Sequence, residues 1–95
     1  MIVKFTEMNS EYHQEEKVRK YSINNDIYIN TEKIIHFYGM TVISKDDEKI
    51  TVTCMITAKY QWVLQEVPEQ IYEMISATLL YRARCKPIHS EGPYR

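Results

Sequence analysis

The sequence predicts an α+β fold: a small antiparallel sheet of four or five strands, with one C-terminal helix packed on it. Short stretches of alternating apolar and polar residues recur over the first two thirds of the chain, as in half-buried strands. The segment Pro68–Lys86 instead repeats its apolar residues every three or four positions, as a helix does. With only two glycines and three prolines in 95 residues, we expect one domain over residues 1–86 and a tail over residues 87–95.

Alternation is clearest in "ITVTCMITA", residues 50–58. One face of this strand carries Ile50, Val52, Cys54, Ile56 and Ala58, and the other is mostly threonine. Weaker patterns predict further strands over residues 2–8, 18–23, 27–30, 34–43 and 61–67. Between these strands, the polar segments 9–17, 24–26 and 45–49 are expected to form loops or turns.

Two local signals qualify this pattern. Asn30 or Thr31 can cap a single helical turn ahead of the strand at Ile34, because a side-chain oxygen there accepts a free backbone N–H. Gly39 lies inside a strand pattern and predicts a bulge or a bend.

The helix is expected to begin at Pro68, since a missing N–H costs nothing at the first helical position. The negative charge of Glu69 is favourable at the positive end of the helix dipole. Val67 occupies the N-cap position but has no side-chain acceptor. We expect the apolar stripe to pack on the sheet face that carries Val52, Cys54 and Ile56. That stripe consists of Ile71, Ile75 and Leu79.

Charge and composition exclude several classes. The formal net charge is −1, so no overall field favours nucleic acid or acidic substrates. No apolar run approaches the roughly 18 residues that span a bilayer, and the acidic N-terminal region is unlike a secretory signal. A disulfide between Cys54 and Cys85 stays open as an alternative, but we expect two free thiols and a cytoplasmic location.

No catalytic or metal-binding pattern stands out. The residue types for zinc are Cys85, His89, His13 and His36, but only the first two lie close in sequence and Pro87 separates them. Cys54 alternates with aliphatic residues, as a core thiol does, and the paired carboxylates lie in polar runs typical of solvated surface. Two isolated glycines cannot form a phosphate-binding loop. We therefore expect a protein that is not an enzyme and holds no cofactor or metal.

The segments "YINTEKIIHF", "KITVTCM", "WVLQE" and "VPEQIYEMI" together resemble the pattern of the FlbD/SwrD family, small bacterial and phage-borne β-domain proteins. The resemblance covers about half the chain and consists of apolar positions rather than a catalytic signature. The chain departs from the pattern in the insert at residues 9–17, in lacking an Asn-Gly hairpin, and in Val67, where the family has a capping serine. The resemblance implies a small binding or regulatory protein without enzymatic residues.

Eight tyrosines and one tryptophan are the residue types that dominate protein interfaces. We therefore predict a protein-binding or regulatory module, of phage or mobile-element origin, that modulates a host protein and forms a homodimer through the threonine face of residues 50–58. The predicted contact residues are Tyr38, Tyr60, Trp62, Tyr72, Tyr81, Arg82 and Arg84. Two alternatives stay open: a nucleic-acid binder with a Tyr/Trp and Arg/Lys surface, and a dimer that sequesters a small phosphate-bearing ligand.

Overall fold

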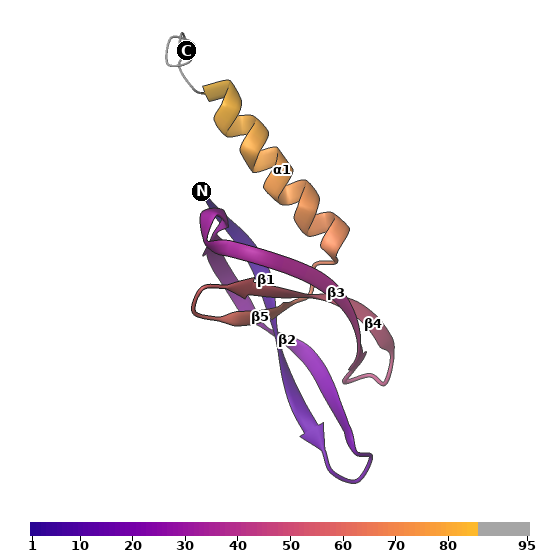
Figure 1. The fold of residues 1–95 in the computed structure, drawn as a ribbon. Coiled ribbons are helices and arrows are strands. Elements are labelled where there is room, and N and C mark those ends of the chain that lie inside the picture. The colour runs from indigo at the N-terminus through magenta and orange to yellow at the C-terminus, as the bar shows by residue number, and fades with distance from the viewer. Residues whose placement is uncertain (86–95) are drawn as a thin grey trace.

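The computed structural model describes the backbone of residues 1–85 and the side chains of residues 1–77. It confirms the α+β class, with five strands followed by one helix (Figure 1). The elements in chain order are β1 (Ile2–His13), β2 (Val18–Asn30), the 3₁₀ helix η1 (Thr31–Lys33), β3 (Ile34–Ser44), β4 (Lys49–Thr57), β5 (Gln61–Leu64) and α1 (Pro68–Cys85).

The strands close into a barrel in the order β1-β2-β3-β4-β5. Three neighbouring pairs are long antiparallel ladders: β1 with β2, β3 with β4, and β4 with β5. The two remaining contacts are short. β2 and β3 pair in parallel only where Lys20 and Tyr21 meet Ile43 and Ser44, and β1 meets β5 only where Glu7 pairs with Leu64. The expected antiparallel sheet is therefore present, but closed by two narrow seams.

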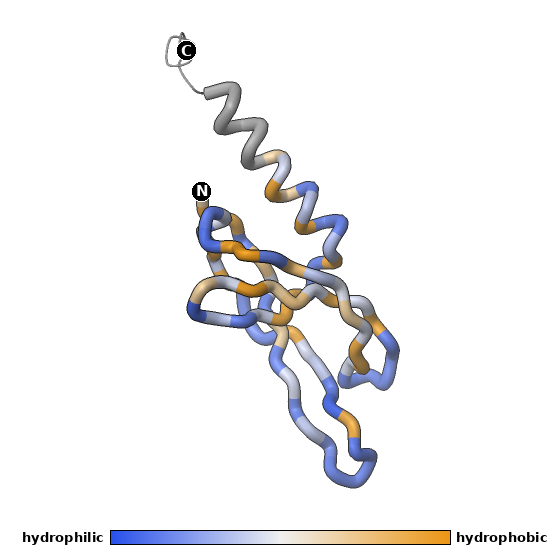
Figure 2. Tube along the Cα trace, in the orientation of Figure 1, coloured by the Kyte–Doolittle hydropathy of each residue, from blue (hydrophilic) through white to orange (hydrophobic). Residues whose placement is uncertain are grey.

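The loop expected over residues 9–17 is wrong, because β1 continues to His13 and only residues 14–17 form a turn. Residues 8–13 pair with residues 18–23 in a hairpin arm that extends from the barrel (Figure 1). The arm is mostly hydrophilic (Figure 2), so it lacks the apolar alternation of a half-buried strand. Cross-strand contacts stabilise it instead: Arg19 lies 5.9 Å from the Tyr12 ring centroid and donates to Ser10 Oγ at 2.9 Å.

The turn expected at residues 24–26 is also wrong, since β2 runs through it without a break. The β1–β2 register shifts here: Glu7 pairs with Asn25 and Met8 pairs with Ile23, which leaves Asn24 as the extra residue of a bulge. Asn24 Nδ2 donates to Glu7 Oε1 at 3.1 Å. The polar side chains that signal a turn thus mark a bulge inside one long strand.

The cap expected ahead of Ile34 and the turn expected over residues 45–49 are both confirmed. Asn30 Oδ1 accepts a hydrogen bond from Glu32 N at 3.0 Å and caps η1. The charged segment 45–49 turns the chain between β3 and β4, with Asp47 at a φ of 66°. This left-handed conformation suits Asp, whose side chain tolerates it better than most.

Gly39 does not form the expected bulge. Its pairing with Thr53 is in register, and the irregularity of β3 lies between Ile34 and His36. The glycine is instead needed for a close approach, because an added Cβ would lie 3.0 Å from Pro68 Cγ. Gly39 therefore lets the start of α1 lie directly against β3.

Two apolar clusters lie on opposite faces of β4. The larger contains the fully buried Phe5, Met55, Leu64 and Ile71 together with Ile29, and the smaller contains Met8, Val42 and Val52. Because successive residues of a strand point to opposite faces, the expected helix-packing face is wrong: Ile71 packs on the Met55 face rather than on the Val52 face. The expected dimer face is also wrong, since Thr53 and Met55 are completely buried.

The helix begins at Pro68, as predicted, and Ile71 N donates to Val67 O at 3.0 Å. Ile71 is fully buried, and Met74 and Ile75 pack against the same cluster. From this anchorage α1 runs away from the barrel (Figure 1). Leu79 and the tail expected over residues 87–95 lie outside the described side chains. In the described part of the chain, no helix is long and apolar enough to cross a membrane.

Candidate binding surfaces

Tyr60 and Trp62 form an aromatic pair at the mouth of the barrel. Their ring centroids are 5.5 Å apart and the rings are tilted by 45°. The β4–β5 turn fixes the pair, because Thr57 Oγ1 donates to Tyr60 O at 3.0 Å and Thr57 N donates to the same oxygen at 2.9 Å. Trp62 is half-buried against the larger core cluster, whereas Tyr60 is 62% exposed. The pair therefore offers an aromatic surface on a rigid support.

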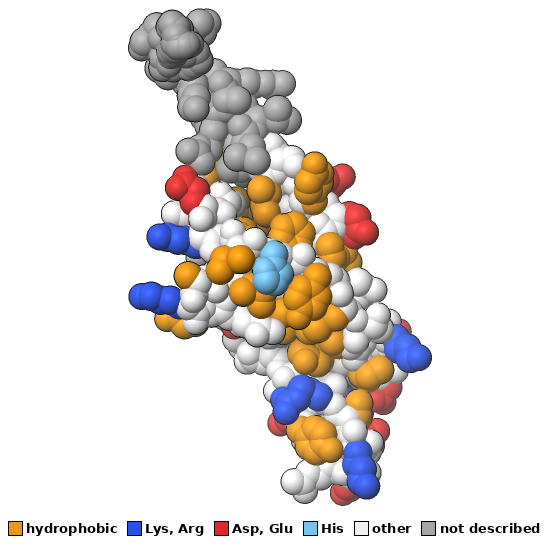
Figure 3. Space-filling model, viewed as in Figure 1, with side chains coloured by type: hydrophobic (Ala, Val, Ile, Leu, Met, Phe, Trp, Pro, Cys, Tyr) orange, Lys and Arg blue, Asp and Glu red, His pale blue; other side chains and the backbone are white. Residues whose placement is uncertain are grey.

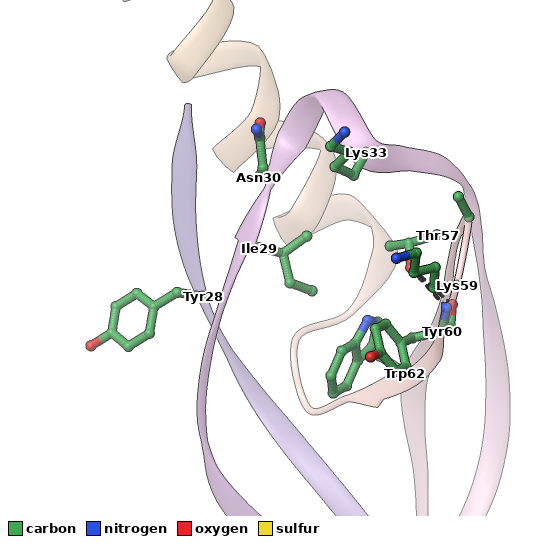
Figure 4. Close-up of a pocket in the computed structure, with 9 residues that line it drawn as sticks. Tyr28, Ile29, Asn30, Lys33, Thr57, Lys59, Tyr60 and Trp62 are labelled. Carbon is green, nitrogen blue, oxygen red and sulfur yellow. Dashed lines mark hydrogen bonds between the residues drawn. The ribbon is translucent and has the colours of Figure 1, made fainter.

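The mouth holds an open cavity of about 400 Å³. It lies where the end of β2, η1 and the β4–β5 turn meet (Figure 4). Its lining residues are Tyr28, Ile29, Asn30, Lys33, Thr57, Ala58, Lys59, Tyr60 and Trp62. In Figure 4 the Tyr28 ring points away from the other labelled side chains, while Ile29 lies between η1 and the aromatic pair.

The charge of this mouth is positive. Lys33 and Lys59 are exposed, and neither has a carboxylate within 4.0 Å among the described side chains. The neighbouring Glu32 carboxylate lies 3.8 Å from the N-terminal ammonium of Met1. No Asp or Glu occurs among the lining residues, so two lysines set the local charge of a chain whose net charge is −1.

A second surface, the β3–α1 face, carries the exposed side chains of Ile35, Tyr38 and Tyr72. Figure 3 shows hydrophobic side chains gathered over β3 and the start of α1, around a histidine. Phe37 and Pro68 lie beside Tyr72 in a shallow hollow that Glu69 and Glu73 also line. This surface is therefore apolar at its centre and acidic along α1.

Tyr38 is held in place on this face. Its ring stacks with His36 at a centroid distance of 6.3 Å. The neighbouring Cys54 thiol, and to a lesser extent burial, raises the pKa of Tyr38. Gln61 Nε2 donates to Cys54 Sγ at 3.0 Å, and Cys54 is completely buried. The prediction of a free core thiol is thus confirmed for Cys54.

The predicted contact residues separate into two sites. Tyr60 and Trp62 meet at the barrel mouth, whereas Tyr38 and Tyr72 are exposed on the β3–α1 face. The others, Tyr81, Arg82 and Arg84, lie in the part of α1 whose side chains are not described. Sequence reasoning missed Lys33, Lys59 and Ile35 as site residues. The stretch "KYQW" does place Lys59 beside the aromatic pair, but only the pairing of β3 with β4 brings Lys33 to the same cavity.

The described side chains contain no group of three or more His, Cys, Asp or Glu that could hold a metal ion. His13 lies at the tip of the hairpin arm, 3.6 Å from Glu11 and 3.9 Å from Glu16, far in the sequence from His36 on β3. Cys85 and His89 lie outside the described side chains.

Comparison with family models, with curated proteins and with solved structures found no match to this chain. The resemblance to the FlbD/SwrD family therefore stays a prediction. Functional inference rests on the geometry of the barrel mouth and of the β3–α1 face.

Proposed function

We propose that this chain is a small protein-binding module that contacts its partner through the β3–α1 face. The observation that supports it most is the exposure of three large side chains there: 62% for Ile35, 47% for Tyr38 and 66% for Tyr72. A contiguous exposed apolar surface with a polar rim is typical of interaction sites, because contact of that surface with water does not stabilise the monomer.

The arrangement of Tyr38 also supports binding. Its ring stacks with His36, which restricts the side-chain freedom that would be lost when a partner docks. Tyrosine combines a large apolar ring with a polar tip, which is why it is enriched among the residues that dominate binding energy. Tyr38 is therefore the proposed anchor of the interface.

Glu69 and Glu73 define the expected chemistry of the partner. Both are exposed and line the hollow beside Tyr72. Electrostatic complementarity at an interface favours basic residues opposite such a rim and disfavours acidic ones. We propose that the partner is a host protein with an apolar surface bordered by Lys or Arg, and that a phage or mobile-element protein occupies it to regulate that host protein.

The matched test compares two double variants. Ile35→Ala with Tyr72→Ala removes one exposed isoleucine and one exposed tyrosine from the β3–α1 face. Ile23→Ala with Tyr12→Ala removes the same two residue types from the hairpin arm, where they are 57% and 49% exposed. Proteins captured by each immobilised chain from cells that carry the gene are quantified by mass spectrometry, and the affinity of the purified partner is then measured.

We expect the first double variant to weaken binding by about tenfold or more, since truncating a central interface residue costs more than about 1 kcal/mol. The second double variant keeps the affinity of the unmodified chain. Equal affinities of both variants would exclude the β3–α1 face as the contact surface. If the partner is a second copy of the chain, light scattering detects a dimer. Only the first double variant then dissociates that dimer.

A further inference from the structure

We propose that the barrel mouth binds a nucleotide, with the Tyr60–Trp62 pair stacking on the base and Lys33 and Lys59 holding the phosphate. This site is separate from the proposed protein-binding face, and its residues come from the end of β2, η1, the β4–β5 turn and β5.

The shape of the mouth fits a ligand of this size. A volume of about 400 Å³ falls within the range of small-molecule sites, which also occur preferentially in the mouths of β-barrels. Ile29 and Trp62 belong to or pack against the barrel core, so they form a stable apolar floor. Tyr60 extends this surface outward, with most of its ring area in contact with water.

The aromatic pair favours a flat ring as one part of the ligand. Stacking between a base and an aromatic side chain contributes about 1–3 kcal/mol, and it tolerates any base because every base has a π-face. The three hydrogen bonds between Thr57 and Tyr60 hold the turn in one conformation. The platform is therefore preorganised, which reduces the entropy lost on binding.

The two lysines favour an anionic group as the other part. Neither Lys33 nor Lys59 has a carboxylate partner among the described side chains, and no acidic residue lines the mouth. Lysine is a common partner of phosphate. Figure 4 shows Lys59 beside the aromatic pair and Lys33 on η1, across the opening from the pair.

Asn30 adds a polar group to the same opening. Its Oδ1 accepts from Glu32 N at 3.0 Å and from the Met1 ammonium at 3.4 Å, which fixes the orientation of the amide. The Nδ2 atom of this amide has no partner among the described residues and can donate to a base or to a phosphate oxygen. A flat ring, an anion and a hydrogen-bond acceptor together describe a nucleotide, either free or within a single strand.

The single tryptophan allows a direct test, because Trp62 is the only one in the chain and its fluorescence reports stacking at this site. Full-length protein is titrated with adenosine monophosphate and, separately, with a short single-stranded oligodeoxyadenylate. Adenosine and inorganic phosphate serve as partial ligands. The double variant Lys33→Ala with Lys59→Ala keeps the tryptophan, and so does Tyr60→Ala.

The matched control is Lys45→Ala with Lys49→Ala, which removes the same charge at the opposite end of β4. We expect saturable quenching of Trp62 fluorescence that the Lys33/Lys59 variant weakens by about tenfold or more, because charged hydrogen bonds are the stronger ones. Tyr60→Ala weakens binding as well, and the control variant leaves it unchanged.

The two ligand arms identify the source of the nucleotide. Tight binding of adenosine monophosphate, with no higher affinity for the oligonucleotide, assigns the site to free nucleotides. Much tighter binding of the oligonucleotide, with a strong dependence on salt, assigns it to a single strand. Absence of saturable quenching by both ligands up to millimolar concentration would overturn the proposal, and so would an equal loss in the control variant.

Discussion

The Glu66 carboxylate accepts hydrogen bonds from both the backbone N–H and the hydroxyl of Thr6, a residue 60 positions away in the sequence. Oε1 lies 3.0 Å from Thr6 N, and Oε2 lies 2.9 Å from Thr6 Oγ1. The backbone completes this joint, because Gln65 N donates to Thr6 O at 2.9 Å. The carboxylate thus replaces a strand partner where β1 and β5 share a single residue pair.

This joint predicts the effect of Glu66→Ala. The substitution leaves the Thr6 N–H and hydroxyl without their acceptor in a partly buried position, and such losses cost about 1–3 kcal/mol. We expect the free energy of unfolding to fall by that amount in a urea titration. Glu15→Ala, at an exposed turn residue, is the control and should change it by less than about 0.5 kcal/mol. Equal effects of both would show that the barrel closes without the Glu66 side chain.

The contact between Gly39 and Pro68 gives a second prediction. A Cβ at position 39 would lie 3.0 Å from Pro68 Cγ, so Gly39→Ala forces the start of α1 away from β3. We expect a loss of about 1–3 kcal/mol in the free energy of unfolding, the usual cost of overpacking. The measurement is chemical denaturation followed by the fluorescence of Trp62.

Pro68→Ala supplies the control for this prediction. Removing the ring relieves the crowding, so Gly39→Ala should cost less when Pro68 is already alanine, and the two effects should not add. Strictly additive effects would mean that the crowding at position 39 comes from something other than the Pro68 ring.

The sequence predicted the elements that follow one regular pattern and missed those set by long-range contacts. The alternation of residues 50–58 located β4, and Pro68 located the start of α1, because each signal is local. The hairpin arm was missed because strands with both faces in water need no apolar alternation. Asn24 was assigned to a turn because a turn and a bulge favour the same residue types.

The residues of the candidate sites show the same difference between local signals and long-range contacts. Tyr60 and Trp62 are two positions apart where the β4–β5 turn enters β5, so their proximity could be predicted from the sequence. Lys33 joins them because Ile34 pairs with Thr57, which places the end of η1 beside the β4–β5 turn. No local pattern records a contact over such a separation. The helix face was misassigned for a related reason, since both faces of β4 are buried and periodicity cannot say which one α1 covers.

The third prediction concerns Lys20, whose side chain links two turns at the narrow seam between β2 and β3. Its Nζ lies 2.6 Å from Asp47 Oδ1 and 2.9 Å from Glu16 Oε1, beside the parallel pairing of Lys20 with Ile43. The hydrogen bond with Asp47, followed by that with Glu16, raises the pKa of Lys20 above its usual value. Folding therefore favours the protonated amine.

The sign of the pH dependence follows from this shift. A base whose pKa is higher in the folded state stabilises the fold fully below its unfolded pKa, and the contribution is lost as the pH rises through the folded pKa. Lys20→Met keeps the apolar stem and removes the charge. We expect it to lower the melting temperature by a constant amount between about pH 7 and about pH 9, below the usual lysine pKa of about 10.4. Above that pKa the difference from the unmodified chain should shrink toward zero.

Salt provides an independent check of the same interaction. Asp47 and Glu16 are largely exposed, so the attraction is open to screening, and the effect of Lys20→Met should decrease at about 1 M NaCl, where the Debye length is about 3 Å. Lys45→Met, at an exposed lysine without a carboxylate partner among the described residues, should show neither dependence. A Lys20→Met effect that is the same at every pH and salt concentration would assign the role of Lys20 to packing of its stem. The seam between β2 and β3 would then be held by its backbone hydrogen bonds, including Lys45 N to Tyr21 O at 3.1 Å.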